Sequence, residues 1–227
     1  MRINKSKPKP IKWSLIGKRI LRHHLPLFVM SAVSVAVICQ VMDTNDLLFC
    51  LSMATGYTGL VLLAITLLTS PLKVIRKLPN PVSDDFTRDI GIWAAIVSIA
   101  HVVFGLQRHF TGRMWLYFLN EGINFPYIRM DLFGTANHTG LIATIILIVL
   151  LATSNNRILS ALGVKSWKRL QRWNYGLFAL VLLHSGLYQV IVDRSSPYPY
   201  ILAVIGIMVI TIQLSGFFVR RSHQKSL

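Results

Sequence analysis

Two histidines lie isolated within long apolar stretches of this sequence. His101 is in RDIGIWAAIVSIAHVVFGLQRHF and His184 is in QRWNYGLFALVLLHSGLYQ. An imidazole placed in hydrocarbon is costly unless it binds something, so both are candidate functional residues. Such a pair could ligate a metal or haem iron, relay protons or bind a substrate. A single histidine of this kind is more often a packing residue bonded across helices.

The spacing places the two histidines at one depth. Each follows the expected start of its helix, near residues 89 and 172, by about 12 residues, or about 18 Å of α-helix. Both helices are expected to run in the same direction through a hydrocarbon core of about 30 Å. Two imidazoles level with each other on separate helices are what an axially ligated haem between helices requires.

Six apolar segments of membrane-spanning length position these residues. The chain of 227 residues is 53% hydrophobic and 14% charged, whereas soluble proteins have about 25% charged residues. We therefore expect an all-α, polytopic integral membrane protein built as a six-transmembrane-helix bundle. No Gly-rich nucleotide fingerprint occurs, so any nucleotide or flavin module is expected in another protein. The expected spans are roughly 25–42, 47–70, 89–107, 138–153, 172–192 and 199–218.

The basic residues are distributed unevenly along the chain. Of the 24 Lys and Arg residues, those on one side of the expected bundle are only Arg108, Arg113, Arg129 and Arg194. The positive-inside rule then puts both termini in the cytoplasm. The net charge of +16 is thus a topology signal and a contact with membrane lipid, and nucleic-acid binding is not expected. The expected domains are a basic tail and interfacial helix at 1–24, a six-helix domain at 25–218 and a basic tail at 219–227.

Some polar residues near the span ends have structural interpretations. Pro71 is expected to end the second span, because proline interrupts the helical hydrogen bonds. Asp84, Asp85 and Asp89 are expected to cap the third span, since acidic residues favour a helix N-terminus. The adjacent histidines at 23–24 are expected at the level of the lipid headgroups, facing solvent or lipid.

The outer side carries two cysteines and a long aromatic segment. Cys39 and Cys50 flank the first outer turn and could form a disulfide in an oxidising compartment, but two buried thiols are the favoured interpretation. The segment 108–137 is typical of an aromatic belt at the membrane interface, or of a lid or docking surface. Its His109 and His138 are expected to be solvated or hydrogen-bonded, and are only secondary candidates for cofactor contacts.

Four stretches occur along the chain in this order: LLTSPLKVIRK, RDIGIWAAIVSIAH, TGLIATIILIVLLATSN and KSWKRLQRWNYGLFALVLLH. Together they resemble the ferric reductase-like transmembrane domain family. The resemblance spans about residues 50–190, and within the family the chain is most similar to the haem-binding membrane subunits of the bacterial methionine sulfoxide reductase system. It implies an oxidoreductase component of a bacterial inner membrane, with no catalytic residue assigned.

In this family, which includes NADPH oxidases and metalloreductases, spans three and five supply histidines to b-type haem. The resemblance therefore implies that His101 and His184 are the axial ligands of a haem b in the outer half. Many members carry another histidine 13 residues before the one in span five, and Gln171 occupies that position here. Arg88 lies 13 residues before His101. Neither is a usual iron ligand, so one haem is expected rather than two.

The missing second haem would leave about 20 Å for the electron to cross, from 13 residues at about 1.5 Å each. We expect either a flavin (FMN or FAD) or a quinone in this gap, or lateral donation by a membrane quinol. Arg88, Gln171 and Arg172 are candidates for holding a flavin, a quinone or a haem propionate, together with Lys168. The alternative is that the cations are positive-inside anchors.

Two functions remain open from the sequence. One is a haem b electron-transfer protein that takes electrons from a cytoplasmic flavin or nicotinamide donor, or from a membrane quinol. Its acceptor would lie on the outer side, as a periplasmic partner enzyme, ferric ion or another oxidant. The other is a haem-free transporter or assembly subunit whose histidines relay protons or bind substrate. None of the eight Asp and Glu residues is expected at mid-membrane, which weakens proton-coupled transport.

Overall fold

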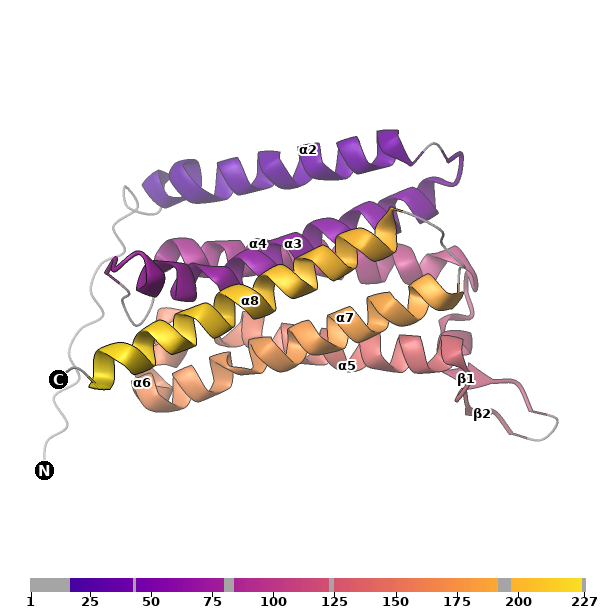
Figure 1. Ribbon diagram of the computed structural model, residues 1–227. Coiled ribbons are helices and arrows are strands. Elements are labelled where there is room, and N and C mark those ends of the chain that lie inside the picture. The colour runs from indigo at the N-terminus through magenta and orange to yellow at the C-terminus, as the bar shows by residue number, and fades with distance from the viewer. Residues whose placement is uncertain (1–16, 43, 80–83, 123–124, 192–196, 226–227) are drawn as a thin grey trace, which may run out of the picture.

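The computed structural model describes residues 17–42, 44–79, 84–122, 125–191 and 197–225. Six of the helices are long and apolar enough to cross a membrane. The predicted all-α, six-helix bundle of a multi-pass membrane protein is thus confirmed (Figure 1). The helices are α2 (Leu25–Val41), α3 (Leu47–Ile75), α4 (Asp85–Arg108), α5 (Leu132–Thr153), α7 (Trp173–Ile191) and α8 (Tyr198–Lys225).

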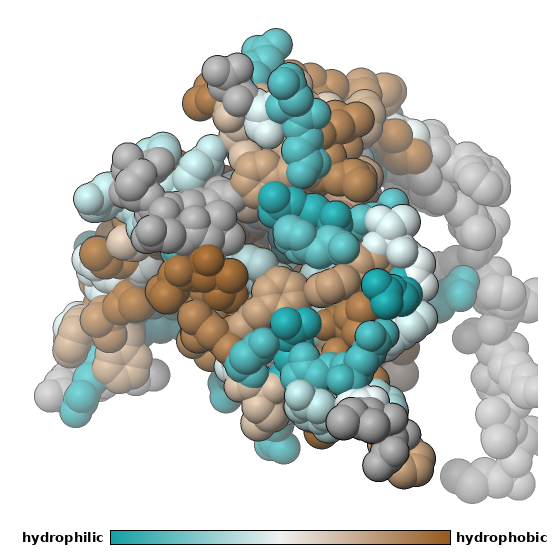
Figure 2. Space-filling model, turned by 90° about the vertical axis from the view of Figure 1, so that its right-hand side faces the viewer, coloured by the Kyte–Doolittle hydropathy of each residue, from teal (hydrophilic) through white to brown (hydrophobic). Residues whose placement is uncertain are grey.

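Short elements connect the spans at the two ends of the bundle. The two strands pair antiparallel, and their hairpin projects beyond the helices (Figure 1). We call this the hairpin end and the opposite end, which carries α6, the α6 end. Figure 2 views the hairpin end, where hydrophilic residues occupy much of the middle with hydrophobic surface beside them. The short elements are η1 (Ile20–His24), η2 (Met114–Tyr117), β1 (Leu119–Asn120), β2 (Tyr127–Ile128) and α6 (Asn156–Gln171).

Several helix boundaries differ from the expected ones. From Gly17, the first described residue, helical structure runs into α2, and α8 continues to Lys225, so the expected tails are partly extensions of the spans. α5 begins at Leu132 rather than 138 because Asp131 caps it, accepting a hydrogen bond from the Gly134 N–H at 2.6 Å. An N-cap carboxylate satisfies a backbone donor that the first turn leaves free.

α3 is the central helix of the bundle. It packs against α2, α4, α7 and α8. Its buried Leu60, Leu63 and Leu67 form a core with Leu147 of α5 and Leu177 of α7. The large apolar side chains on the exposed faces of α2 and α8 point away from this core, as expected for surfaces that contact lipid.

Pro71 does not end the second span as predicted, because α8 compensates for it. Proline has no N–H, so the carbonyl of Leu67 one turn earlier lacks its helical partner. Gln213 of α8 donates its Nε2–H to that carbonyl at 2.6 Å. Gly216 of α8 lies against Pro71 so closely that a Cβ there would come within 2.6 Å of the proline ring. A neighbouring helix thus satisfies the backbone group that the proline frees.

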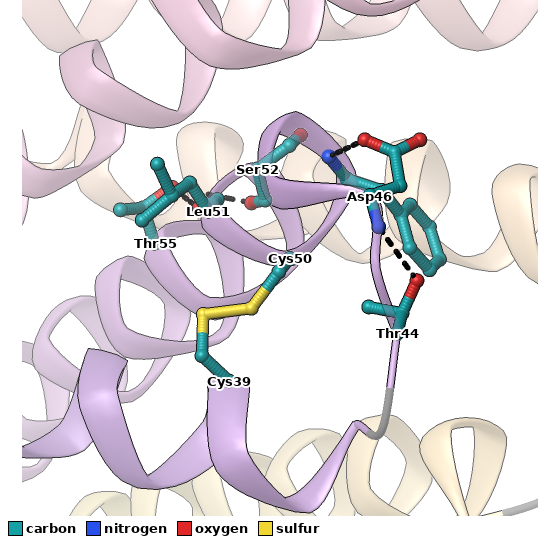
Figure 3. Close-up of a disulfide and its surroundings, with 8 residues drawn as sticks. Cys39, Thr44, Asp46, Cys50, Leu51, Ser52 and Thr55 are labelled. Carbon is teal, nitrogen blue, oxygen red and sulfur yellow. Dashed lines mark hydrogen bonds between the residues drawn. A yellow bond between two sulfur atoms is a disulfide. The ribbon is translucent and has the colours of Figure 1, made fainter.

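A disulfide joins α2 to the bundle at the hairpin end. Cys39 of α2 and Cys50 of α3 are bonded, with Cα atoms 5.4 Å apart (Figure 3). The interpretation of two free thiols is therefore wrong. The turn between the two helices is short, and Asp46 caps α3 by accepting a hydrogen bond from the Phe49 N–H at 2.9 Å. This geometry brings Cys50 opposite Cys39.

An ion cluster joins α2 to α4 at the α6 end. Asp89 is completely buried and accepts a hydrogen bond from Arg19 Nε at 3.0 Å. His23 Nδ1 lies 2.8 Å from the same carboxylate, and His24 accepts a hydrogen bond from Trp93 Nε1 at 3.2 Å. The expectations that Asp89 only caps a helix and that the two histidines face solvent or lipid are wrong. The continuous helix that precedes α2 carries these residues against α4.

Candidate functional site

α4 and α7 bring His101 and His184 together in the middle of the bundle. Their ring centroids are 6.1 Å apart and the ring planes are inclined by 81°. Metal–imidazole bonds are about 2.0–2.1 Å long, so two imidazoles that bind one metal from opposite sides have centroids about 6–6.5 Å apart. The predicted common depth is confirmed, and the spacing fits two axial ligands.

The Nδ1 atom of each histidine contacts a backbone carbonyl on the neighbouring helix. His101 bonds to the Ser52 carbonyl of α3 at 2.7 Å, and His184 bonds to the Ala136 carbonyl of α5 at 2.8 Å. Because a carbonyl can only accept, Nδ1 carries the hydrogen in both rings. The Nε2 lone pairs are then the ones left for a ligand, which is the usual arrangement of metal-ligating histidines.

Glycines make room for both imidazoles. A Cβ on Gly56 of α3 would lie 2.9 Å from His101 Nδ1, and a Cβ on Gly140 of α5 would lie 2.8 Å from His184 Nδ1. Side chains do not pack at these distances, so any other residue would push the ring away from its carbonyl. The two glycines therefore permit the hydrogen bonds that orient the histidines.

α3 and α5 present the same local arrangement. The Thr55 hydroxyl donates to the Ser52 carbonyl at 3.2 Å, and the Thr139 hydroxyl donates to the Ala136 carbonyl at 2.7 Å. In both helices the threonine follows the carbonyl by three residues and the glycine follows it by four. Sequence reasoning missed the role of Gly140. The recurrence of a Thr-Gly pair in the second and fourth spans is the signal that could have identified it.

The histidine pair lies in a cavity of about 290 Å³, close to the lower limit of about 300 Å³ for small-molecule sites. Leu63 and Leu147 form an apolar wall toward the α6 end, and Arg108 lines the cavity toward the hairpin end. Tyr188 also lies on the polar side, with its ring 5.0 Å from that of His184 and its hydroxyl donating to Asn137 Oδ1 at 2.9 Å. The cavity is thus polar at one end and apolar at the other.

The two secondary histidines stay apart from the pair. His109 lines the cavity near the hairpin end, and its ring packs against Tyr117 at 6.3 Å. Burial, and then the charge of Arg108, lower the pKa of His109. His138 packs against Phe118, and its Nε2 is buried with no hydrogen-bond partner among the described residues. Among the described ring pairs, His109 has Phe110, Tyr117 and Phe133 as its partners and His138 has Phe118.

A second cavity, of about 480 Å³, lies at the α6 end. Arg88, Gln171 and Arg172 line it together with Lys168, so the structure brings this predicted group together. The cavity borders on the one that holds the histidine pair, since both are lined by Leu63, Ala94 and Leu147. The two cavities are therefore stacked along the bundle and separated by a thin apolar layer.

Comparison with known proteins adds no assignment. Among the described residues, no group of three or more His, Cys, Asp or Glu side chains is arranged to hold a metal ion. Any functional proposal therefore depends on the geometry of His101 and His184. No protein-family model matches the chain, and no curated protein matches it.

Proposed function

We propose that the protein is a haem b-containing transmembrane electron-transfer protein of the ferric reductase-like family. The observation that supports this most directly is the facing pair His101 and His184, 6.1 Å apart between ring centroids. Two imidazoles from separate helices are a common axial set for b-type haem, whose porphyrin provides the other four ligands. When bound, the haem would supply one-electron redox chemistry, and the chain would supply ligation, orientation and burial.

Each part of the surrounding cavity has a role in this proposal. The Ser52 and Ala136 carbonyls hold the imidazoles in one tautomer and make Nε2 a stronger donor to iron. The apolar wall excludes water and suits the hydrocarbon edge of a porphyrin. The hairpin-end wall contains Arg108, whose guanidinium also lies 3.6 Å from Asp46. A guanidinium binds carboxylates well, so this wall would suit the carboxylate edge of a haem.

One haem per chain is the expected stoichiometry. The positions at which many ferric reductase-like proteins carry a second ligand pair hold Arg88 and Gln171 here. Both line the α6-end cavity, and neither side chain is a usual iron ligand. Electrons would have to enter through this end from a bound flavin or quinone, from a soluble donor or from a membrane quinol.

We further propose that the hairpin end faces the outer side. The Cys39–Cys50 disulfide lies at this end, and disulfides persist in oxidising compartments. Of the basic residues that the structure describes, only Arg108, Arg113 and Arg129 lie toward the hairpin end, and the positive-inside rule then makes the opposite end the cytoplasmic face. Electrons would then leave toward an outer acceptor, such as a periplasmic enzyme or ferric ion. Assignment to a bacterial inner membrane rests on the family resemblance alone.

A reduced-minus-oxidised visible spectrum of the purified protein tests the proposal. We expect a bis-histidine b-type signal with one haem per chain, lost in both His101→Ala and His184→Ala. His138→Ala is the matched control and should retain the signal, because that ring is not part of the pair. Absence of haem in protein from haem-replete cells would reject electron transfer and leave the haem-free transporter or assembly role. Two haems per chain would reject the stoichiometry.

A further inference from the structure

His109 lies at the hairpin end of the cavity that holds the histidine pair. It directly follows the last turn of α4, its side chain lines the cavity, and it is exposed to solvent. It follows His101 by eight positions in the sequence, which corresponds to about 12 Å along a helix. His109 can therefore exchange protons with the surrounding water and also respond to a change of charge at the histidine pair.

The imidazole ring of His109 is held in place by aromatic packing. It lies against Phe110, Tyr117 and Phe133, with centroids 6.4, 6.3 and 6.3 Å away. The backbone N–H of His109 donates a hydrogen bond to the Tyr117 hydroxyl at 3.1 Å. These contacts involve ring faces and a backbone group, so none of them requires a particular protonation state of the imidazole. The ring can gain or lose a proton without a change in its packing.

Several other titratable or charged side chains lie near this ring. Phenols and guanidinium groups normally titrate well above neutral pH, and carboxylates titrate well below it. An imidazole titrates between these limits, so His109 is the member of the group that changes charge near neutral pH. The others are Arg108 of α4, Asp46 beside α3, Tyr117 of η2, Tyr188 of α7 and the Arg129–Asp131 pair beside Phe133.

The surroundings of His109 keep the imidazole neutral at pH 7. Burial, and then the positive charge of Arg108, lower the pKa of His109 below its usual 6.5, while Asp46 acts in the opposite direction. A negative charge added at the histidine pair favours the imidazolium, because opposite charges attract. At about 12 Å and an effective dielectric constant of about 20, this attraction raises the proton affinity of His109 about tenfold.

We propose that His109 is a redox-linked proton-binding site. The proposal rests on the haem-dependent function proposed above. His109 binds one proton from the solvent at the hairpin end when one electron arrives from the donor. It releases that proton to the same side when the electron leaves for the acceptor. The bond that forms and breaks is the second N–H bond of the imidazole ring. One negative and one positive charge enter together, so arrival of the electron is favoured at lower pH.

The pH dependence of the haem midpoint potential tests the proposal. Spectroelectrochemical titrations of the purified full-length protein are run between about pH 5 and pH 8, the range in which histidines titrate. The test variant is His109→Gln, which keeps a polar side chain that does not titrate. The matched control is His138→Gln, which changes the other secondary histidine, a residue outside the described lining of the cavity.

We expect the wild-type potential to rise by about 59 mV in total as the pH is lowered, because a tenfold change in proton affinity corresponds to that value for one electron. The rise should occur between the pKa of His109 in the oxidised protein, which lies below 6.5, and a pKa about one unit higher in the reduced protein. His109→Gln should lose this rise, and His138→Gln should keep it.

The pKa of His109 itself gives a second readout. Histidines labelled with nitrogen-15 are followed by NMR, and the His109 signal is assigned from its absence in His109→Gln. We expect a pKa about one unit higher in the reduced protein than in the oxidised protein. Equal pKa values in the two redox states would overturn the proposal. A pH-dependent potential that survives in His109→Gln would also overturn it, because another group would then bind the proton.

Haem content is measured first on the same preparations. Protein without haem would reject the electron-transfer function and this proposal with it. Haem-loaded protein whose potential does not vary with pH would reject the role of His109 alone.

Discussion

The two ends of the bundle are built by different interactions. At the hairpin end, a disulfide joins α2 to α3, and nearer the middle of the bundle backbone carbonyls with facing glycines orient the histidine pair. At the α6 end, α2 is held by the Asp89 ion cluster and the cavity is surrounded by cations. A metal ligand needs one fixed orientation, which close packing provides. Charged side chains around a cavity interact over a longer range and tolerate more movement.

The two cavities lie close together along the bundle. Leu63, Ala94 and Leu147 line both cavities, so one apolar layer separates the cavity that holds the histidine pair from the cavity that is lined by cations. In the hydrocarbon region unpaired charge is costly, so polar groups there must be oriented by backbone partners. Near the membrane surface, water and lipid headgroups solvate charged side chains and lower their free-energy cost. The depth of a region in the membrane therefore decides whether its polar groups are held by backbone partners or by other charges.

The largest expected effect comes from removing the buried charge at the α6 end. Asp89→Asn leaves Arg19 without its buried counter-charge, which typically costs about 3–5 kcal/mol of stability. The measurement is the apparent melting temperature in detergent. Asp85→Asn is the control, because that side chain is 59% exposed and exposed ion pairs contribute at most about 1 kcal/mol. Equal effects of the two substitutions would mean that the buried cluster does not hold α2.

Breaking the disulfide tests the covalent attachment at the other end. The cysteines are separated by 11 positions, and closing a loop of that size stabilises a protein by about 3 kcal/mol. Cys39→Ser/Cys50→Ser should therefore melt at a lower temperature than the wild type. Reductant should destabilise the wild type and leave the double variant unchanged. A wild-type protein indifferent to reductant would show that the ion cluster alone suffices to hold α2.

Adding one methyl group beside a histidine tests whether close packing against a glycine holds each imidazole on its carbonyl. Gly56→Ala and Gly140→Ala place a Cβ within 2.9 and 2.8 Å of the Nδ1 atoms, so each ring must leave its carbonyl. Loss of such supporting interactions typically weakens metal binding about 10- to 100-fold. Haem retention during purification is the readout. Gly186→Ala is the control, because nothing lies within 4 Å of that added Cβ, and haem loss there too would argue against a specific role.

The smallest effect concerns the proline in α3. Gln213→Leu removes the donor to the Leu67 carbonyl, and hydrogen bonds between membrane helices contribute about 0.6 kcal/mol, with a maximum of about 1.7. The readout is a small decrease in melting temperature. Pro71→Ala restores the backbone N–H, so the same glutamine substitution should cost less in that background. An unchanged cost would mean that Gln213 acts through packing rather than by satisfying the carbonyl.

Much of the site was predictable because membrane helices have a regular rise and a limited thickness to cross. That regularity placed His101 and His184 at one depth before any contact was known. It also placed Arg88 and Gln171 near one level, because each lies 13 residues before its histidine, although Gln171 ends α6 rather than beginning α7. The partners of Asp89 were not predictable, since Arg19 lies 70 positions away and no local pattern links them. The same holds for the carbonyls of Ser52 and Ala136, which carry no side-chain signal.

The sequence by itself determined the class and the main elements of this protein. Apolar length and the scarcity of charge require six spanning helices, because only hydrogen-bonded helices satisfy the backbone in hydrocarbon. Tertiary structure alone decided that Cys39 meets Cys50, that α3 passes through Pro71 and that each imidazole faces a glycine. These outcomes depend on how neighbouring helices pack against one another. A residue pattern within one helix records which face is apolar, but not which backbone atom will lie opposite it.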